Sequence, residues 1–205
     1  MTIIGAKKIR WRWTLFSDDM ITQWEMKYSA SKHYRAKIRS LPRAYHNILV
    51  ATAWTCRESD LVINMIDKTI HESLEDGNYT SMQLLDVIQE AIVSWCKTLK
   101  EVSEDNPQFS LLILDVDNNV VYFIEEFAVR ILWENVECVC WSWQSLFYKF
   151  RDRNFRLSEE NAFRDAIIEA AVIDDGCWVP VYETNWIDFY TYDEDSKIIA
   201  EEHLE

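Results

Sequence analysis

The stretch HNILVATAWTCRESDLVINMIDKTIHESL, residues 46–74, contains the change of hydrophobic pattern that decides the fold. Its first part, residues 46–53, is a short apolar run of the kind that forms a β-strand. From Ser59 onwards the apolar residues follow a helical spacing, at Leu61, Val62, Met65, Ile66, Ile70 and Leu74. The segment therefore predicts a strand followed by an amphipathic helix, which ends at Asp76-Gly77.

A second helix is predicted directly after the first one. Thr80 or Ser81 supplies a capping side chain, and the helical pattern continues to about Lys100. Its apolar stripe consists of Leu84, Leu85, Ile88, Ala91, Ile92 and Trp95. Two consecutive helices without a strand between them are not the alternation of a βαβ fold.

Strands are predicted on both sides of this helix pair. Before it they cover residues 2–6, 11–16 and 35–41, and after it residues 109–116, 120–126 and about 128–140. In the segment 11–16, Trp11, Trp13 and Leu15 alternate with Arg12 and Thr14. The last strand is broken around Glu134-Asn135, and residues 117–119 predict a tight turn.

A second helix pair follows these strands. A short helix is predicted near Gln144, and Ser158 caps a longer one that ends at Gly176. Residues 177–183 and 187–193 then alternate as a hairpin. The complete order predicts an α+β, four-layer αββα sandwich, in which two antiparallel sheets stack face to face between helix pairs.

The composition favours a single domain. The chain has only 3 Gly and 3 Pro and no Ser/Gly-rich or Pro-rich linker, while 49% of its residues are hydrophobic. We expect one domain over residues 1–192, followed by an acidic tail, 193–205. The 10 tryptophans predict that large rings fill much of the interior or an interface.

The charge argues against several classes of function. A net charge of −14 is unsuited to binding the phosphates of nucleic acids. No stretch approaches the ~20 apolar residues of a membrane span. The basic residues near the N-terminus precede no apolar signal-peptide region, and five cysteines, an odd number, indicate reduced thiols. We therefore expect a cytoplasmic protein with no membrane or nucleic-acid partner. The acidic residues are spread from Asp18 to Glu205, which counts against a decoy for a basic protein.

With the order of elements established, several stretches resemble proteasome β-subunits and the bacterial HslV peptidase, which are N-terminal nucleophile (Ntn) hydrolases. The resemblance runs from about residue 2 to 185. It is carried, in chain order, by TIIG…TLFSDDMIT, AKIRSLP, HNILVATAWTCRESDLV, WSWQS and AAVIDDGCWVPVYE.

The resemblance implies a threonine hydrolase that acts on peptide bonds. Thr2, exposed by removal of Met1, would be the nucleophile, and its own α-amine, with an ordinary pKa of ~7.7–8.0, would be the base. Asp18 and Lys37 would tune that amine, with Asp19 and Lys32 as the alternatives. The other implied residues are Ser142 and Asp174 near the amine, and Ala53, whose backbone N–H would bind the oxyanion.

The resemblance also implies a peptide or protein substrate and an assembly of identical subunits, such as a ring. No cofactor and no metal is expected. The sequence departs from the family where the family has glycines, because Trp54, Trp141 and Trp143 stand at or beside those positions. The alternative function is therefore a catalytically inactive, proteasome-like scaffold or protein-binding module whose cleft these rings fill.

Overall fold

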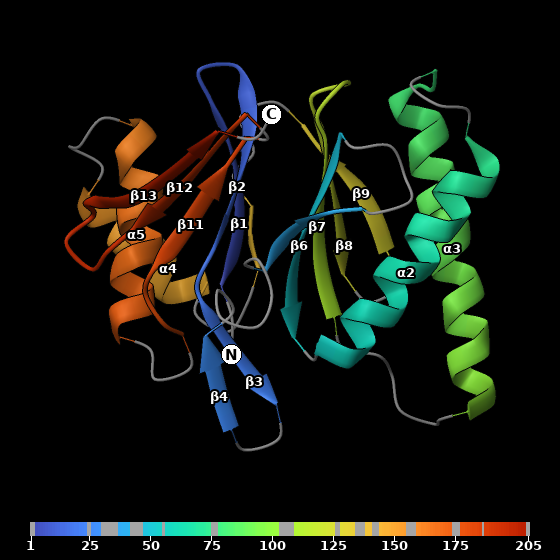
Figure 1. The fold of residues 1–205 in the computed structure, drawn as a ribbon, viewed down its shortest axis with the longest axis horizontal. Helices are drawn as coiled ribbons and strands as arrows, with labels where there is room; N and C mark the ends of the chain where they lie inside the picture. The colour runs from blue at the N-terminus through green and yellow to red at the C-terminus, as the bar shows by residue number, and fades with distance from the viewer. Residues whose placement is uncertain are drawn as a thin grey trace.

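The structure, a computed structural model, consists of two stacked antiparallel sheets between two helix pairs (Figure 1). It describes residues 3–23, 26–29, 37–41, 47–54, 56–74, 78–102, 109–125, 128–133, 138–140, 144–154, 159–173, 177–185 and 187–203. The predicted four-layer αββα sandwich is confirmed.

The first sheet has six strands, in the order β10-β1-β2-β11-β12-β13. Neighbouring strands are antiparallel throughout. Their bounds are β1 Ile4–Ile9, β2 Arg12–Ser17, β10 Cys138–Cys140, β11 Val181–Thr184, β12 Asp188–Tyr192 and β13 Ile198–His203. The helices α4 (Gln144–Asn154) and α5 (Glu159–Ile173) cover its outer face.

The second sheet has five strands in chain order, β5-β6-β7-β8-β9. These are β5 Ile38–Ser40, β6 Ile48–Trp54, β7 Phe109–Asp115, β8 Val120–Glu125 and β9 Ala128–Leu132. The helices α2 (Cys56–Ser73) and α3 (Ser81–Val102) cover its outer face. A separate hairpin, β3 (Met20–Gln23) and β4 (Met26–Ser29), projects from one end of the sandwich (Figure 1).

Strand alternation divides the apolar side chains of the second sheet between two layers. In β6, Ile48 and Val50 face the helices, whereas Leu49, Ala51 and Ala53 face the first sheet. Strands β7 and β8 alternate in the same way, so the sheet is apolar on both faces. This pattern explains why the sequence here is almost continuously hydrophobic, as expected for a sheet that is covered on both sides.

The first sheet packs against α5 at unusually short range. Gly5 of β1 faces this helix, and a Cβ atom at Gly5 would lie 3.1 Å from Phe163 Cζ and 3.2 Å from Ile167 Cδ1. Phe16 of β2 also contacts Phe163, with ring centroids 5.1 Å apart. A glycine at position 5 therefore allows the large ring of Phe163 to approach β1.

Thr80 and Gln83 form a reciprocal cap at the start of α3. The Gln83 N–H donates to Thr80 Oγ1 at 3.3 Å, and the Thr80 N–H donates to Gln83 Oε1 at 2.8 Å. This is the capping-box arrangement, and it selects Thr80 from the two capping residues considered.

Four local predictions need correction. Trp11 does not extend the apolar alternation of β2, because it lies in the turn before that strand and is 64% exposed. Leu61 belongs to the apolar stripe in sequence but is exposed on α2. Residues 128–140 form β9 and β10 in different sheets, and not one interrupted strand. Residues 198–203, expected within an acidic tail, form β13 at the edge of the first sheet.

No helix in the described part of the chain is both long enough and apolar enough to cross a membrane.

Candidate active site

Asp18 lies at the end of β2, next to the first described residue of the chain. Its side chain is buried, and its carboxylate Oδ1 accepts a hydrogen bond of 2.8 Å from the Ile3 N–H. The Asp18 N–H donates in turn to the Ile3 carbonyl at 3.2 Å. Because Ile3 follows Thr2 in the chain, Asp18 is held beside the backbone that leads to the predicted nucleophile.

Lys37 reaches the same carboxylate from the other sheet. It directly precedes β5, and its Nζ donates to Asp18 Oδ1 at 2.5 Å. Both side chains are at least nine-tenths buried. The ion pair therefore connects the two sheets inside the protein, where a charge-assisted hydrogen bond is shielded from water.

The second carboxylate oxygen of Asp18 is also held by backbone donors. The Met20 N–H donates to Asp18 Oδ2 at 3.1 Å, and the Trp178 N–H donates to it at 3.4 Å. Together with Ile3 and Lys37, these groups place hydrogen-bond donors on both oxygens. The orientation of the carboxylate is therefore fixed by four donors, three of which are distant from Asp18 in the sequence.

Arg39 anchors the strand that follows Lys37. It forms an ion pair with Asp60 near the start of α2, on a partly exposed surface. Exposed pairs contribute little stability on their own. The contact joins β5, which follows Lys37, to the first turns of α2.

Ala53 lies in β6 at the same end of the second sheet as Lys37. The register pairs Ile38 with Ala51, so Lys37 is next to the part of β6 that contains Thr52 and Ala53. On its other edge Ala53 pairs with Ser110 of β7. On its first edge, the register of β6 with β5 ends, within the described strands, at the Ile38–Ala51 pair, two residues before Ala53.

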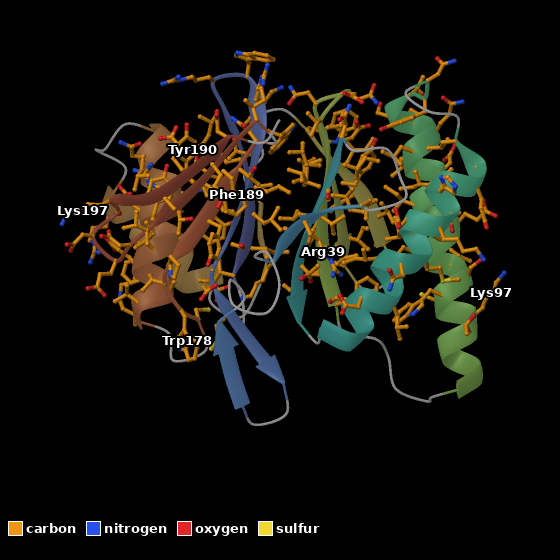
Figure 2. The ribbon with its side chains drawn as sticks, viewed as in Figure 1. Arg39, Lys97, Trp178, Phe189, Tyr190 and Lys197 are labelled. Carbon is orange, nitrogen blue, oxygen red and sulfur yellow. The ribbon has the colours of Figure 1, made fainter. Side chains whose placement is uncertain are left out.

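Asp19, the alternative to Asp18, has a different set of partners. Its buried carboxylate accepts a hydrogen bond of 2.7 Å from the Tyr182 hydroxyl, and its N–H donates to the Trp178 carbonyl at 2.9 Å. Asp18 is therefore the residue that contacts Lys37, while Asp19 attaches the turn to the segment before β11. Figure 2 shows Trp178 at the end of the sandwich from which the β3–β4 hairpin projects.

The hydrogen bonds from Trp178 and Tyr182 were not predicted from the sequence. Both residues are more than 150 positions from Asp18 and Asp19, with separations of 160 for Trp178–Asp18 and 163 for Tyr182–Asp19. The only local signal is that two consecutive aspartates follow a strongly apolar strand. Buried carboxylates need several hydrogen-bond donors. The sequence therefore predicts that Asp18 and Asp19 have partners, but it does not identify the residues that supply them.

One polar atom beside Asp18 has no partner. Ser17 Oγ is buried at the end of β2 and makes no hydrogen bond within the described part of the chain. By strand alternation it is on the same side of β2 as Leu15, which faces the second sheet. A buried hydroxyl without a partner is uncommon and marks this end of the strand as a place for a further polar group.

Several predicted site residues lie outside the described residues. These are Thr2, Ser142 and Asp174, together with the alternative Lys32 and the two tryptophans Trp141 and Trp143. Trp54 ends β6, where its backbone pairs with Phe109, but its side chain is not described. Of the six predicted site residues, the structure thus places Asp18, Lys37 and Ala53, and brings the first two into direct contact.

No metal site emerges from the described residues, since they contain no cluster of three or more His, Cys, Asp or Glu side chains that could hold an ion.

Comparison with known proteins gives structural neighbours but no sequence relatives. No protein-family model matches the sequence, and no curated protein matches it. The structure is similar to that of Thiobacillus denitrificans BPH in complex with epoxomicin, with a TM-score of 0.64 and 14% identity over 89% of this chain and 97% of that chain. A second structure of Thiobacillus denitrificans BPH gives a TM-score of 0.61 and 17% identity over 90% and 96%.

Eukaryotic HslV from Trypanosoma brucei is a further neighbour, with a TM-score of 0.64 and 15% identity over 90% of this chain and 98% of that chain. The chain therefore has the HslV-like, proteasome-like fold over nearly its whole length. At such low identity the likeness concerns the fold. The chemistry has to be argued from the residues of this chain.

Proposed function

We propose that the protein is a proteasome-like N-terminal threonine hydrolase that cleaves peptide bonds with Thr2 after Met1 has been removed. The observation that carries this proposal is the buried Lys37–Asp18 ion pair, whose carboxylate also binds the N–H of Ile3. A buried ion pair costs desolvation, so its presence beside the start of the chain favours a catalytic use over a merely stabilising one.

The proposed reaction begins with attack of the Thr2 Oγ on the carbonyl carbon of the peptide bond. The α-amine of Thr2 takes the hydroxyl proton, and the nearby Lys37 ammonium favours the neutral amine that this step requires. The N–H of Ala53 donates to the oxyanion of the tetrahedral intermediate. The proton then passes to the leaving amine as the C–N bond breaks, and water hydrolyses the ester that remains on Thr2.

Ser142 and Asp174 complete the proposal as polar groups near the α-amine, as the family resemblance implies. A peptide or protein substrate, a cytoplasmic location and an assembly of identical subunits belong to the same proposal. Epoxomicin is bound by Thiobacillus denitrificans BPH, and we include it as a candidate ligand of this protein.

The test starts with the intact mass of protein produced in cells with normal methionine processing. We expect a mass lower by one methionine, hydrolysis of a fluorogenic peptide, and binding of epoxomicin. Thr2→Ala should abolish hydrolysis, whereas Thr2→Ser keeps a hydroxyl and should retain part of it. Lys37→Met should reduce kcat by about 100-fold or more, because it removes the group that favours the free amine.

Lys97→Met is the matched control for the lysine variant. Lys97 is exposed on α3, far from Asp18, and its side chain points away from the helix (Figure 2), so its loss should leave activity unchanged. A folded protein that loses Met1 but hydrolyses no peptide would contradict the enzymatic proposal. Unchanged activity of Thr2→Ala would contradict the assignment of the nucleophile.

The inactive scaffold is the second candidate function. Trp178 supports it, because a partly exposed indole adjoins the backbone N–H that binds Asp18. Retention of Met1, together with absence of hydrolysis and of epoxomicin binding, would favour this function over the enzyme.

A further inference from the structure

Trp178 is held beside the candidate active site by its backbone. Its N–H donates to Asp18 Oδ2 at 3.4 Å, and its carbonyl accepts from the Asp19 N–H at 2.9 Å. The Ile3 N–H binds the other oxygen of the Asp18 carboxylate at 2.8 Å. The backbone nitrogens of Ile3 and Trp178 are therefore at most about 9 Å apart. Trp178 thus lies close to the point where the chain leads to Thr2.

The indole of Trp178 takes no part in the apolar core. Its neighbours Cys177 and Val179 pack in the cluster between the first sheet and α5, whereas Trp178 belongs to none of the apolar clusters of the described residues. Its side chain is 36% exposed at the end of the sandwich (Figure 2). Within the described part of the chain, no aromatic ring and no cation lies against the indole. A fixed backbone with an unpacked ring indicates a side chain that contacts another molecule.

The chemistry of the indole favours a cationic ligand. Tryptophan binds cations better than the other aromatic side chains do, because the faces of its ring are negative. This chain already forms such contacts: the guanidinium of Arg12 lies 4.5 Å from the ring centre of Trp11, and that of Arg164 lies 4.4 Å from the ring centre of Tyr192. A net charge of −14 also attracts cationic ligands and repels acidic ones. Position and charge together favour a basic side chain of a peptide on Trp178.

We propose that Trp178 is a specificity-determining residue, whose indole binds an arginine or lysine side chain of the peptide in the candidate active site. Arginine should bind better than lysine, because its flat guanidinium stacks on the ring as well as carrying the charge. The contact holds the peptide beside Thr2 and supplies no chemistry of its own. This inference rests on the proposed function, since it assigns a substrate class, basic peptides, to the same site.

Two matched peptides test this preference. Both are internally quenched and fluorogenic, and they carry either arginine or citrulline on both sides of the cleaved bond, which mass spectrometry of the products identifies. Citrulline has nearly the shape of arginine but no charge. The assays are done at high ionic strength, so that the net charge of the chain does not by itself favour arginine. For the native protein we expect kcat/KM to be about 3-fold or more higher for the arginine peptide, mainly through a lower KM.

Trp178→Leu removes the ring but keeps an apolar side chain and the backbone N–H that binds Asp18. It should lower the arginine-to-citrulline ratio of kcat/KM to about 1, while kcat for the citrulline peptide stays within about 2-fold of the native value. Trp178→Phe keeps an aromatic face and should retain part of the preference. Trp133→Leu is the matched control, because Trp133 is 74% exposed at the opposite end of the sandwich, beyond the Val121–Leu132 pair. It should leave the ratio unchanged.

A binding measurement separates failure of this inference from failure of the proposed hydrolase. Thr2→Ala lacks the proposed nucleophile, so fluorescence anisotropy of the two labelled peptides on this variant measures binding alone. We expect the dissociation constant of the arginine peptide to be about 3-fold or more lower, and Trp178→Leu in the same protein to abolish the difference. Absence of binding, equal dissociation constants, or a preference that survives Trp178→Leu would overturn the inference. An arginine preference in binding without hydrolysis by the native protein would support it and contradict only the hydrolase.

Discussion

The Tyr182 hydroxyl on β11 donates a 2.7 Å hydrogen bond to the buried carboxylate of Asp19, which lies in the turn after β2. This bond joins two segments that meet beside the candidate active site. Tyr182→Phe removes the donor and leaves the carboxylate buried, so we expect a loss of about 1–3 kcal/mol in the free energy of unfolding. Urea denaturation measures it.

Val172→Ala is the control for that variant. Val172 is 54% exposed on α5, so its truncation removes little packing. Its effect on the free energy of unfolding should be within about 0.5 kcal/mol. Equal effects of the two variants would show that the Tyr182–Asp19 hydrogen bond does not contribute measurably to the free energy of unfolding.

The two partners of the buried ion pair should respond unequally to substitution. Asp18→Asn removes the negative charge from beside the buried Lys37 ammonium, and we expect a loss of about 3–5 kcal/mol in unfolding free energy. Lys37→Met leaves the Asp18 carboxylate with the N–H groups of Ile3, Met20 and Trp178, so the loss should be smaller, about 1–3 kcal/mol. Chemical denaturation at neutral pH gives both values, and the reverse order would contradict this account.

Gly5→Ala should destabilise the protein through crowding against α5. The added methyl group would lie 3.1 Å from Phe163 Cζ and 3.2 Å from Ile167 Cδ1, and inserted groups in tight cores typically cost about 1–3 kcal/mol. Ile167→Val in the same chain removes a neighbouring methyl group and should recover part of the loss. A thermal melt of the two single variants and the double variant measures this coupling, and simple additivity would speak against direct crowding.

Asn119 should stabilise the turn between β1 and β2. Its Oδ1 accepts from the Trp13 N–H at 3.0 Å, and its Nδ2 donates to the Trp11 carbonyl at 2.8 Å. Its φ of 50° also favours asparagine or glycine. We expect Asn119→Gly to lower the free energy of unfolding by about 1–2 kcal/mol, because both hydrogen bonds are lost. Asn119→Ala should lower it further, because alanine is strained at this positive φ. Hydrogen exchange of the Trp13 amide should accelerate in both variants. Unchanged protection would contradict a stabilising role for the Trp13–Asn119 hydrogen bond.

Alkaline pH should unfold the protein through its tyrosines. Burial is the main cause that raises the pKa of Tyr79 and Tyr122, and it raises that of Tyr192 to about 12, with the Glu183 charge adding to the effect. A raised folded-state pKa means that the unfolded tyrosines ionise first. Their contribution to stability is therefore complete below pH ~10 and is lost as the pH rises through the folded-state pKa values.

Tyrosinate absorbance and circular dichroism followed together test this behaviour. The buried tyrosines should ionise only as the structure is lost, so the two signals should change together above pH ~10. Tyr192→Phe removes one of these groups and should make the decline of stability with pH less steep. Ionisation of all tyrosines in a fully folded protein would contradict the prediction.

The layer order was predictable because its signals are local. Val62, Ile66 and Ile70 repeat at helical spacing and all face the second sheet, so periodicity alone identified α2. The β3–β4 hairpin was missed because residues 20–29 contain no glycine, proline or asparagine to indicate a turn. Strand β13 was missed because an edge strand exposed to water has the composition of a solvated tail, as Glu201 and Glu202 show.

The candidate site was predictable only in part, because most of its contacts join segments that are distant in the sequence. Family resemblance pointed to Asp18 and Lys37, and the two side chains are in contact. The partners of Asp19 depend on how β11 meets the end of β2, which no local pattern contains. The separation of β9 from β10 is similar: their residues continue one another in sequence, but their hydrogen-bonding partners, β8 and β1, belong to different sheets.

The two sheets are joined by polar contacts at both ends of β2. At one end Asn119 of the second sheet binds the backbone of Trp13, and at the other Lys37 of the second sheet binds Asp18. Apolar packing between them, as at Leu15, is close but does not choose which polar groups meet at the rim. The two polar contacts make that choice, one at each end of the strand. Loss of Lys37 would therefore remove the polar contact at the candidate active site, while Asn119 still holds the far turn.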